Sequence, residues 1–223
     1  MWYYNVQMGC IAAMTTRVLS IDLGIINFSF CITDFRQHDF EVVHLEKVAI
    51  GSMKQTAFEL TTALIDFLRS CQAINEAPIH NIYIEQQMNR AIKNTVLAYA
   101  TASYFYTEAK IARSDVNIQF VPPRMKFNAI EAYFPGAIES QDICRSKSKE
   151  LKRLSVKIAR SVFTELDISK GVEAMAKYSP KLDDIADAFL QSFAIFLEKN
   201  SRRHLLEDKS KVNINTAIKT QSK

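Results

Sequence analysis

The sequence contains few of the residues that interrupt regular structure. Among its 223 residues are only 5 glycines and 5 prolines, which excludes collagen-like and linker-rich chains. The glycines stand singly, at positions 9, 24, 51, 136 and 171. The chain therefore lacks the glycine-rich loops that surround a nucleotide phosphate, and we expect no nucleotide cofactor. No run of about 18 apolar residues occurs, so we expect no segment that spans a membrane.

Cysteine and histidine are also sparse. The four cysteines, at 10, 31, 71 and 144, form no CxxC pair, and the four histidines, at 38, 44, 80 and 204, show no HxxxH spacing. This pattern argues against a zinc site and favours reduced cysteines in an intracellular, reducing compartment. Residues 1–16 contain no charged side chain, whereas a secretory signal begins with basic residues.

Charge is distributed unevenly along the chain, although the net charge is only +4. Residues 145–160 carry +6 and residues 199–223 carry +5, which leaves the remainder at −7. This separation is compatible with a basic contact surface beside an acidic site. On charge alone, a solvated helix face and a disordered tail are the favoured explanation.

Hydrophobic periodicity predicts an α/β protein. Strands are expected at 17–23, 28–33, 40–48, 79–85 and 117–121, and helices at 53–71, 91–113, 148–166 and 181–199. Three strands in succession followed by strands separated by helices predict a mixed five-stranded sheet with helices packed on it. We therefore expect one domain over 17–200, preceded by an N-terminal extension, 1–16, and followed by a flexible basic tail, 201–223.

Acidic side chains follow two of the predicted strands and open the last predicted helix. Asp22 ends the first strand, Glu85 ends the fourth, and Asp183, Asp184 and Asp187 begin the helix. Parallel neighbouring strands would bring Asp22 and Glu85 to the same edge of the sheet. Each acid alone also has an ordinary structural explanation, since Asp22 can cap a turn, Glu85 can begin a surface loop and acids favour the first turn of a helix.

Carboxylates that converge in this way repel one another unless a cation lies between them. Mg²⁺ and Mn²⁺ prefer carboxylate oxygens, and a pair of such ions is a common device for phosphodiester hydrolysis. The acids taken together therefore favour a metal-dependent site.

The motifs IDLGIIN at 21–27, IEQQ at 84–87 and KLDDIADAF at 181–189 resemble those of the RuvC-type Holliday junction resolvases of the RNase H superfamily. The resemblance covers about residues 17–200 and is greatest to the resolvases of poxviruses and other large DNA viruses. It implies an RNase H-like fold, with helices on both faces of the sheet. It also implies DNA recombination and the processing of replicated viral DNA, at a cytoplasmic replication site if the chain is poxvirus-like.

The resemblance also assigns roles to particular residues. Asp22, Glu85, Asp184 and Asp187 become the catalytic acids that bind two Mg²⁺ ions, for which Mn²⁺ can substitute. Asp183 is an alternative ligand in place of Asp184, and Asn27 supports the site. Some relatives carry, at the position of Met88, an aromatic side chain that inserts at an opened base step, so Met88 is also a DNA-binding candidate. A catalytic or phosphate-binding lysine is expected before the last helix, with Lys147, Lys149 and Lys152 as candidates. The basic DNA-binding candidates are these three lysines together with Arg153 and Lys157.

These implications define an expected enzyme, an endodeoxyribonuclease that makes paired nicks in a four-way junction. The approximate two-fold symmetry of a junction predicts a homodimer. The predicted helix 91–113 is a candidate interface and equally a candidate core helix. The rival hypotheses are an RNase H-like nuclease that acts on flaps or RNA–DNA hybrids, a non-catalytic DNA-binding protein, and an ATPase of the sugar-kinase and actin type. The single glycines and short length count against the ATPase, and the four acids, which repel phosphate, count against a mere DNA binder.

Overall fold

The computed structural model describes residues 15–36, 39–87, 91–127, 131 and 148–200. Residues 1–14 of the expected extension and the whole expected tail, 201–223, lie outside the described residues. The strands are β1 (Thr16–Asp22), β2 (Phe28–Phe35), β3 (Phe40–Val48), β4 (Asn81–Glu85) and β5 (Asn117–Val121). The helices are α1 (Ala57–Ser70), α2 (Gln72–Asn75), α3 (Ile92–Ile111), α6 (Ser148–Glu165), α7 (Ser169–Lys177) and an unlabelled helix over 183–200.

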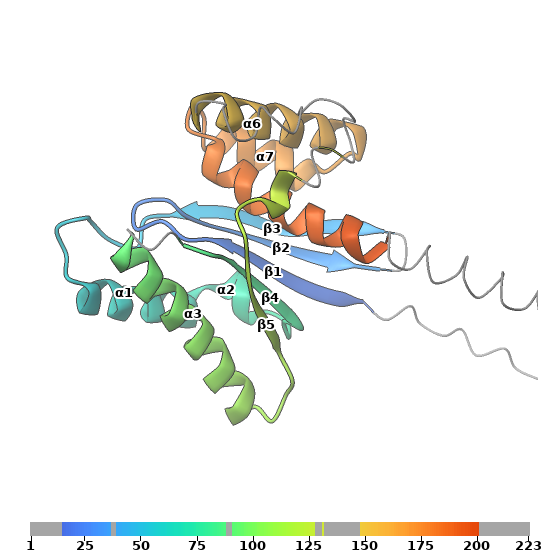
Figure 1. The fold of residues 1–223 in the computed structure, drawn as a ribbon. Helices are drawn as coiled ribbons and strands as arrows, with labels where there is room; N and C mark the ends of the chain where they lie inside the picture. Colours follow the sequence, from blue (N-terminus) through green and yellow to red (C-terminus); the bar gives the residue numbers. More distant parts are fainter. Residues whose placement is uncertain (1–14, 37–38, 88–90, 128–130, 132–147, 201–223) are drawn as a thin grey trace, which may run out of the picture.

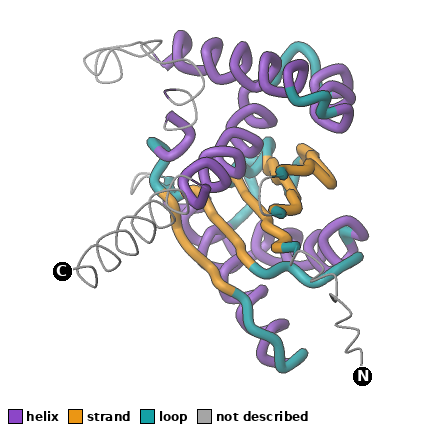
Figure 2. Tube along the Cα trace, turned by 90° about the vertical axis from the view of Figure 1, so that its right-hand side faces the viewer, coloured by secondary structure: helices purple, strands orange, loops and turns teal. Residues whose placement is uncertain are grey.

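The strands form one mixed sheet in the order β3-β2-β1-β4-β5. β1 pairs with β2, and β2 with β3, in antiparallel fashion, whereas β1 pairs with β4, and β4 with β5, in parallel fashion. Each parallel connection passes through helices, as short hairpin turns cannot join parallel strands. The predicted mixed five-stranded sheet, with helices on both faces, is thereby confirmed (Figures 1 and 2).

One face of the sheet packs against α1, α2 and α3 (Figure 1). α1 begins with a capping box, in which the Thr56 side chain accepts from the Glu59 amide and the Glu59 carboxylate accepts from the Thr56 amide. Its leucines at 60, 64 and 68 are fully buried, at the spacing of one helix face. They pack with Ile21, Phe28 and other strand residues into one hydrophobic cluster.

The other face packs against α6, α7 and helix 183–200. Hydrogen bonds join this helix to the strands: Thr33 Oγ1 and Ser192 Oγ lie 2.7 Å apart, and the Gln191 amide donates to the Tyr83 carbonyl. Gly171 lets α7 approach α6, because a Cβ at this position would lie 2.2 Å from the Phe163 ring. None of the helices in the described part of the chain has the length and apolar content that a bilayer crossing requires.

Candidate active site

Asp22 and Glu85 leave the sheet side by side. Ile21 of β1 pairs with Ile84 of the parallel strand β4, so the next residue of each strand is one of the two acids. Carboxyl ends of parallel strands are a common location for ligand sites in open sheets. The predicted juxtaposition of these two carboxylates is therefore present in the structure.

A row of polar side chains crosses the sheet from β1 to β3 at the level of Asp22. Asp22 pairs with Ser29 of β2, and Ser29 pairs with Lys47 of β3. Directly paired residues project from the same face of a sheet, here the face that carries helix 183–200. Ser29 Oγ donates a 2.8 Å hydrogen bond to the carbonyl oxygen of Asp184, which fixes the start of that helix over the row.

The three acids of helix 183–200 have different partners. Asp183 pairs with Lys152 of α6, whereas Asp184 Oδ2 lies 3.7 Å from Lys47 Nζ. Asp187 Oδ2 lies 2.7 Å from Lys126 Nζ. Asp184 and Asp187 are three residues apart and so share a helix face. The helix therefore presents this pair to the sheet edge, while Asp183 is engaged by α6.

Lys126 lies at the centre of the acids. It belongs to a short helical turn, 125–127, that follows β5, the parallel neighbour of β4. Its Nζ is 2.7 Å from Asp187 Oδ2 and 3.3 Å from Glu85 Oε2, and its side chain is only 11 % exposed. The ammonium group thus joins a carboxylate of the sheet to one of the helix. Sequence reasoning placed the expected lysine at 147, 149 or 152 and missed both Lys126 and Lys47.

Burial controls the electrostatics of the centre. It raises the pKa of Asp22 well above the ordinary value, and the nearby charges of Glu85 and Asp187 raise it further. Burial also raises the pKa of Glu85, although the charge of Lys126 opposes this shift. Burial alone would lower the pKa of Lys126, but Asp187 and Glu85 raise it above its ordinary value. The acids are therefore held in a site that favours a bound cation.

The pKa values of the helix acids differ for the same physical reasons. Burial, and then the charge of Asp183, raises the pKa of Asp184. Partial burial would also raise the pKa of Asp183, but the hydrogen bond and charge of Lys152 lower it below the ordinary value. Lys152 of α6 therefore stabilises the ionised form of Asp183. No such hydrogen bond from the described residues stabilises the ionised form of Asp184.

The donor set fits a hard divalent ion. Asp184 Oδ2 and Asp187 Oδ1 are buried and accept no hydrogen bond from the described residues, although buried oxygens normally have a partner. As they stand, no three histidine, cysteine or acidic side chains of the described part are grouped closely enough to hold one ion. Glu85 and Asp187 are instead paired with the Lys126 ammonium group, and Asp184 with that of Lys47. Carboxylate oxygens of this kind are the ligands that Mg²⁺ and Mn²⁺ prefer.

Asn27 lies in a tight turn between β1 and β2. A Cβ on Gly24 would be 2.8 Å from the Asn27 carbonyl oxygen, so the turn requires the glycine that the first motif supplies. Asn27 and Gly24 also line a cavity of about 430 Å³ together with Met53 and Ile92. The turn therefore places Asn27 beside the strand that carries Asp22.

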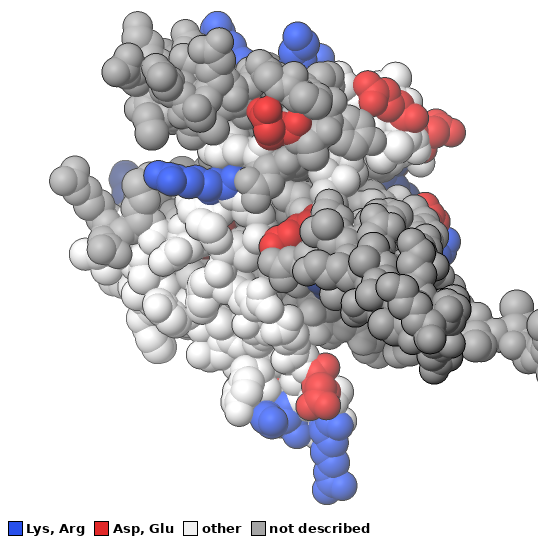
Figure 3. Space-filling view, turned by 45° about the vertical axis from the view of Figure 1, so that its right-hand side comes forward, with Lys and Arg blue, Asp and Glu red and all other residues white. Residues whose placement is uncertain are grey.

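The basic candidates are only partly covered by the structure. Met88 and Lys147 lie outside the described residues, and of Lys149 only the helical backbone is described. Lys152, Arg153 and Lys157 are exposed on α6. Figure 3 shows basic side chains along the upper margin of the molecule, at the level of α6. This helix therefore offers positive charge on the same side of the sheet as the acids.

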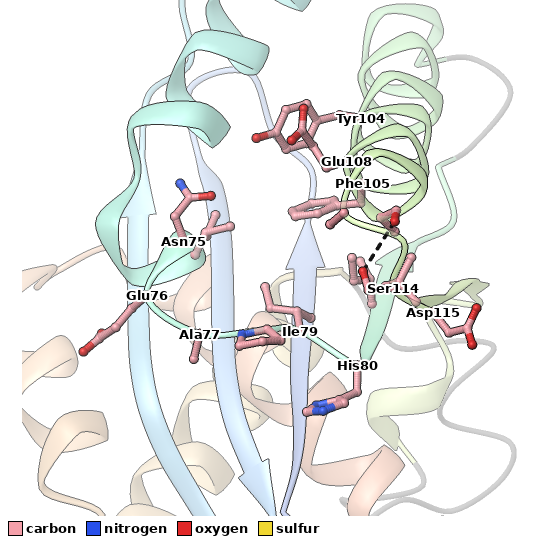
Figure 4. A pocket seen from close by; sticks show the side chains of 16 residues that line it. Asn75, Glu76, Ala77, Ile79, His80, Tyr104, Phe105, Glu108, Ser114 and Asp115 are labelled. Carbon is pink, nitrogen blue, oxygen red and sulfur yellow. Dashed lines mark hydrogen bonds between the residues drawn. The ribbon is translucent and has the colours of Figure 1, made fainter.

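A larger cavity, of about 720 Å³, lies at the opposite end of the parallel strands. Ile79 and His80, which precede β4, line one side of it, and Tyr104, Phe105 and Glu108 of α3 line another (Figure 4). It contains none of the acids predicted for catalysis. The cavity and the acidic centre are therefore separate features of the fold.

No protein-family model matches the sequence, and no characterised protein matches it significantly by sequence. Comparison of structures defines the class of fold: the chain has the RNase H-like fold seen in RuvC-type nucleases. The resemblance indicated by the three motifs is thereby confirmed for the fold.

Three solved structures illustrate this similarity. The fowlpox virus Holliday junction resolvase has a TM-score of 0.56 and 15% identity, covering 82% of this chain and 99% of its own. Thermus thermophilus RuvC has a TM-score of 0.54 and 14% identity, covering 82% and 96%. The yeast mitochondrial Holliday junction resolvase has a TM-score of 0.53 and 19% identity, covering 82% and 79%.

Proposed function

We propose that this chain is a structure-selective, Mg²⁺-dependent endonuclease that resolves four-way DNA junctions. The observation that carries the proposal is the gathering of buried carboxylates from β1, β4 and helix 183–200 at one edge of the sheet. The fold supports it, because structures of the fowlpox virus resolvase and T. thermophilus RuvC contain Holliday junction DNA. Cys31, which is buried, and Cys71, which is partly exposed, are both free thiols, in agreement with the proposed intracellular, reducing location.

Asp22, Glu85, Asp184 and Asp187 would hold the divalent ions. Bound there, such ions supply an activated water and stabilise the leaving oxygen in phosphodiester hydrolysis. Asp183 is the weaker candidate ligand, because Lys152 already engages its carboxylate. Ser29 fixes the backbone of Asp184 relative to Asp22. One of the proposed ligands is therefore held in a fixed position relative to Asp22 before an ion binds.

Lys126 is the further functional residue in this proposal. Its ammonium group balances Glu85 and Asp187 when they are ionised. It also lies where a phosphate oxygen close to the acids would need a positive partner, since carboxylates alone repel the DNA backbone. Lys126 is therefore expected to contribute both to the integrity of the empty site and to substrate binding.

α6 supplies the proposed DNA backbone contact. Lys152, Arg153, Lys157 and Arg160 are exposed along it. The Asp183–Lys152 pair joins this basic helix to the start of the helix that carries the acids. A phosphate backbone that follows α6 would thus reach the acidic centre. Such contacts release counterions and make binding sensitive to salt.

α3 supplies the proposed homodimer surface. Its inner face is buried through Leu97, Ala98, Thr101 and Phe105. Its outer face carries a stripe at heptad spacing, formed by Ile92, Val96, Tyr99, Ser103 and Tyr106. Tyr99 also contacts Phe120 of the edge strand β5, with ring centroids 5.1 Å apart. A second copy of the chain is the proposed partner, because an uncharged stripe at this spacing complements its own two-fold copy.

A substrate comparison tests the function. With Mg²⁺, the purified chain should nick a four-way junction much faster than a linear duplex, a flap or an RNA–DNA hybrid, and without the ion it should nick none. Glu85→Gln should abolish cleavage and retain junction binding. Glu108→Gln is a matched control, since Glu108 lines the distant cavity.

The outcomes separate the rival hypotheses. Equal or faster cleavage of the hybrid or flap would replace the junction resolvase with another RNase H-like nuclease. Junction binding without cleavage under every divalent ion would favour a non-catalytic DNA-binding protein. Full activity of Glu85→Gln would remove Glu85 from the catalytic set.

A further inference from the structure

We propose that Lys47 is a positioning residue, which holds the Asp184 carboxylate and the start of helix 183–200 in the geometry needed to bind a divalent ion. The inference rests on the proposed function, because it concerns the same metal site. It assigns a task to a strand, β3, that contributes none of the predicted acids.

The pairing of the strands places Lys47 in line with the acids. Lys47 pairs with Ser29, and Ser29 pairs with Asp22, so the three side chains project from one face of the sheet at one height. Ser29 and Lys47 then both contact the segment that begins helix 183–200. The row thus links the sheet to the helix at two neighbouring points.

The contacts of Lys47 leave its ammonium group little freedom. Its Nζ donates a 2.7 Å hydrogen bond to the Lys181 carbonyl oxygen, lies 3.7 Å from Asp184 Oδ2, and is 5.5 Å from the centroid of the Tyr178 ring. The side chain is 12 % exposed. With these three neighbours, the Lys47 ammonium group holds the backbone at Lys181, just before helix 183–200, and the carboxylate of Asp184, the first acid of that helix to face the acidic centre.

Asp184 needs such a partner. Its Oδ2 is buried and accepts no hydrogen bond from the described residues. Lys47 Nζ, 3.7 Å from this oxygen, therefore supplies the close positive charge that orients the carboxylate. Residues that orient a metal ligand typically change metal affinity by about 10–100-fold when they are removed.

Lys47 and Lys126 are expected to act in opposite directions. Lys126 Nζ lies between Glu85 and Asp187, where it competes with a cation for their oxygens. Lys47 reaches Asp184 from β3, and its hydrogen bond goes to a backbone carbonyl. Loss of Lys126 should therefore leave ion affinity unchanged or increase it, whereas loss of Lys47 should weaken it.

The test is calorimetric titration of the full chain with Mg²⁺ and with Mn²⁺, in the absence of DNA. Lys47→Met should raise the Kd for the ion by about 10-fold or more, and Lys47→Arg, which keeps the charge, should restore part of the affinity. Circular dichroism checks that each variant is folded. Lys47→Gln takes the place of Lys47→Met if the latter does not fold.

Lys177→Met is the matched control. Lys177 also lies over the Tyr178 ring and also joins β3, through Glu46, but it is 63 % exposed and does not contact Asp184. Its loss should leave the Kd for the ion within about twofold of wild type, since surface pairs contribute little. With DNA, Lys47→Met should lower kcat at limiting Mg²⁺ and recover at high Mg²⁺.

The outcomes distinguish this inference from the function on which it rests. A wild-type chain that binds no divalent ion would overturn the proposed function. A wild-type chain that binds the ion, together with a folded Lys47→Met of equal affinity, would overturn the positioning role alone. An equal loss of ion affinity in Lys47→Met and Lys177→Met would also overturn the positioning role, because it would reflect general damage around β3.

Discussion

Replacing Lys126 by methionine tests the electrostatic account of the acidic centre. Met has a similar length and removes only the charge, so Glu85 and Asp187 lose their shared partner. Removing one member of a buried ion pair costs about 3–5 kcal/mol. Because the Lys126 side chain is 11 % exposed and the carboxylates can take up protons, we expect the lower end of this range.

The expected result is a decrease in Tm that Mg²⁺ largely reverses. In a chain of this size, about 3 kcal/mol corresponds to roughly 6–12 °C. A divalent ion that binds between the freed carboxylates replaces the missing charge, so Mg²⁺ should raise the Tm of Lys126→Met more than that of wild type. The assay is thermal unfolding followed by circular dichroism, with and without Mg²⁺.

Lys152→Met is the control for this experiment. It removes another lysine paired with an acid of the same helix, but its side chain is 51 % exposed. Its loss should cost less than about 1 kcal/mol. The reasoning is refuted if Lys126→Met and wild type share one Tm, or if Mg²⁺ raises both by the same amount.

Three further predictions follow from the same structure. Asp22→Asn should raise the metal-free Tm at pH 7, because the raised pKa of Asp22 means that its ionisation costs stability in the folded state. The gain in Tm should shrink once the pH falls below that raised pKa and vanish near the ordinary pKa of an aspartate. Tyr99→Glu should convert a homodimer to monomers in light scattering, whereas Glu108→Gln should not. Lys157→Ala should weaken junction binding and reduce the slope of log K against log salt by about 0.9.

Much of the fold follows from the sequence, because its strands are strongly patterned. The predicted 40–48 and 117–121 strands match β3 and β5, and Asp22 and Glu85 lie at the ends of the strands predicted to carry them. α7 was missed, since it is a nine-residue helix that contains Gly171, a poor helix former. The reason for a glycine at this position is the close approach of the Phe163 ring, which only the tertiary structure reveals.

The two lysines of the centre show where sequence reasoning fails. Lys126 follows a double proline after a parallel strand, and that position alone indicates that it leaves the sheet at the edge where Glu85 lies. Lys47 lies within a strand, and only the cross-strand register aligns it with Asp22. The sequence predicts where strands end and that the acids at two strand ends meet, but not which side chains pair within the strands.

The placement of two acids on helix 183–200 has a consequence for protein synthesis. A ribosome completes all five strands before it reaches Asp184 and Asp187, and the bonds that dock the helix join residues 155 and 159 positions apart. Contacts so distant along the chain form late in folding. A nascent or prematurely terminated polypeptide that lacks this helix carries only two of the four proposed metal ligands, Asp22 and Glu85, so we expect it to have no nuclease activity.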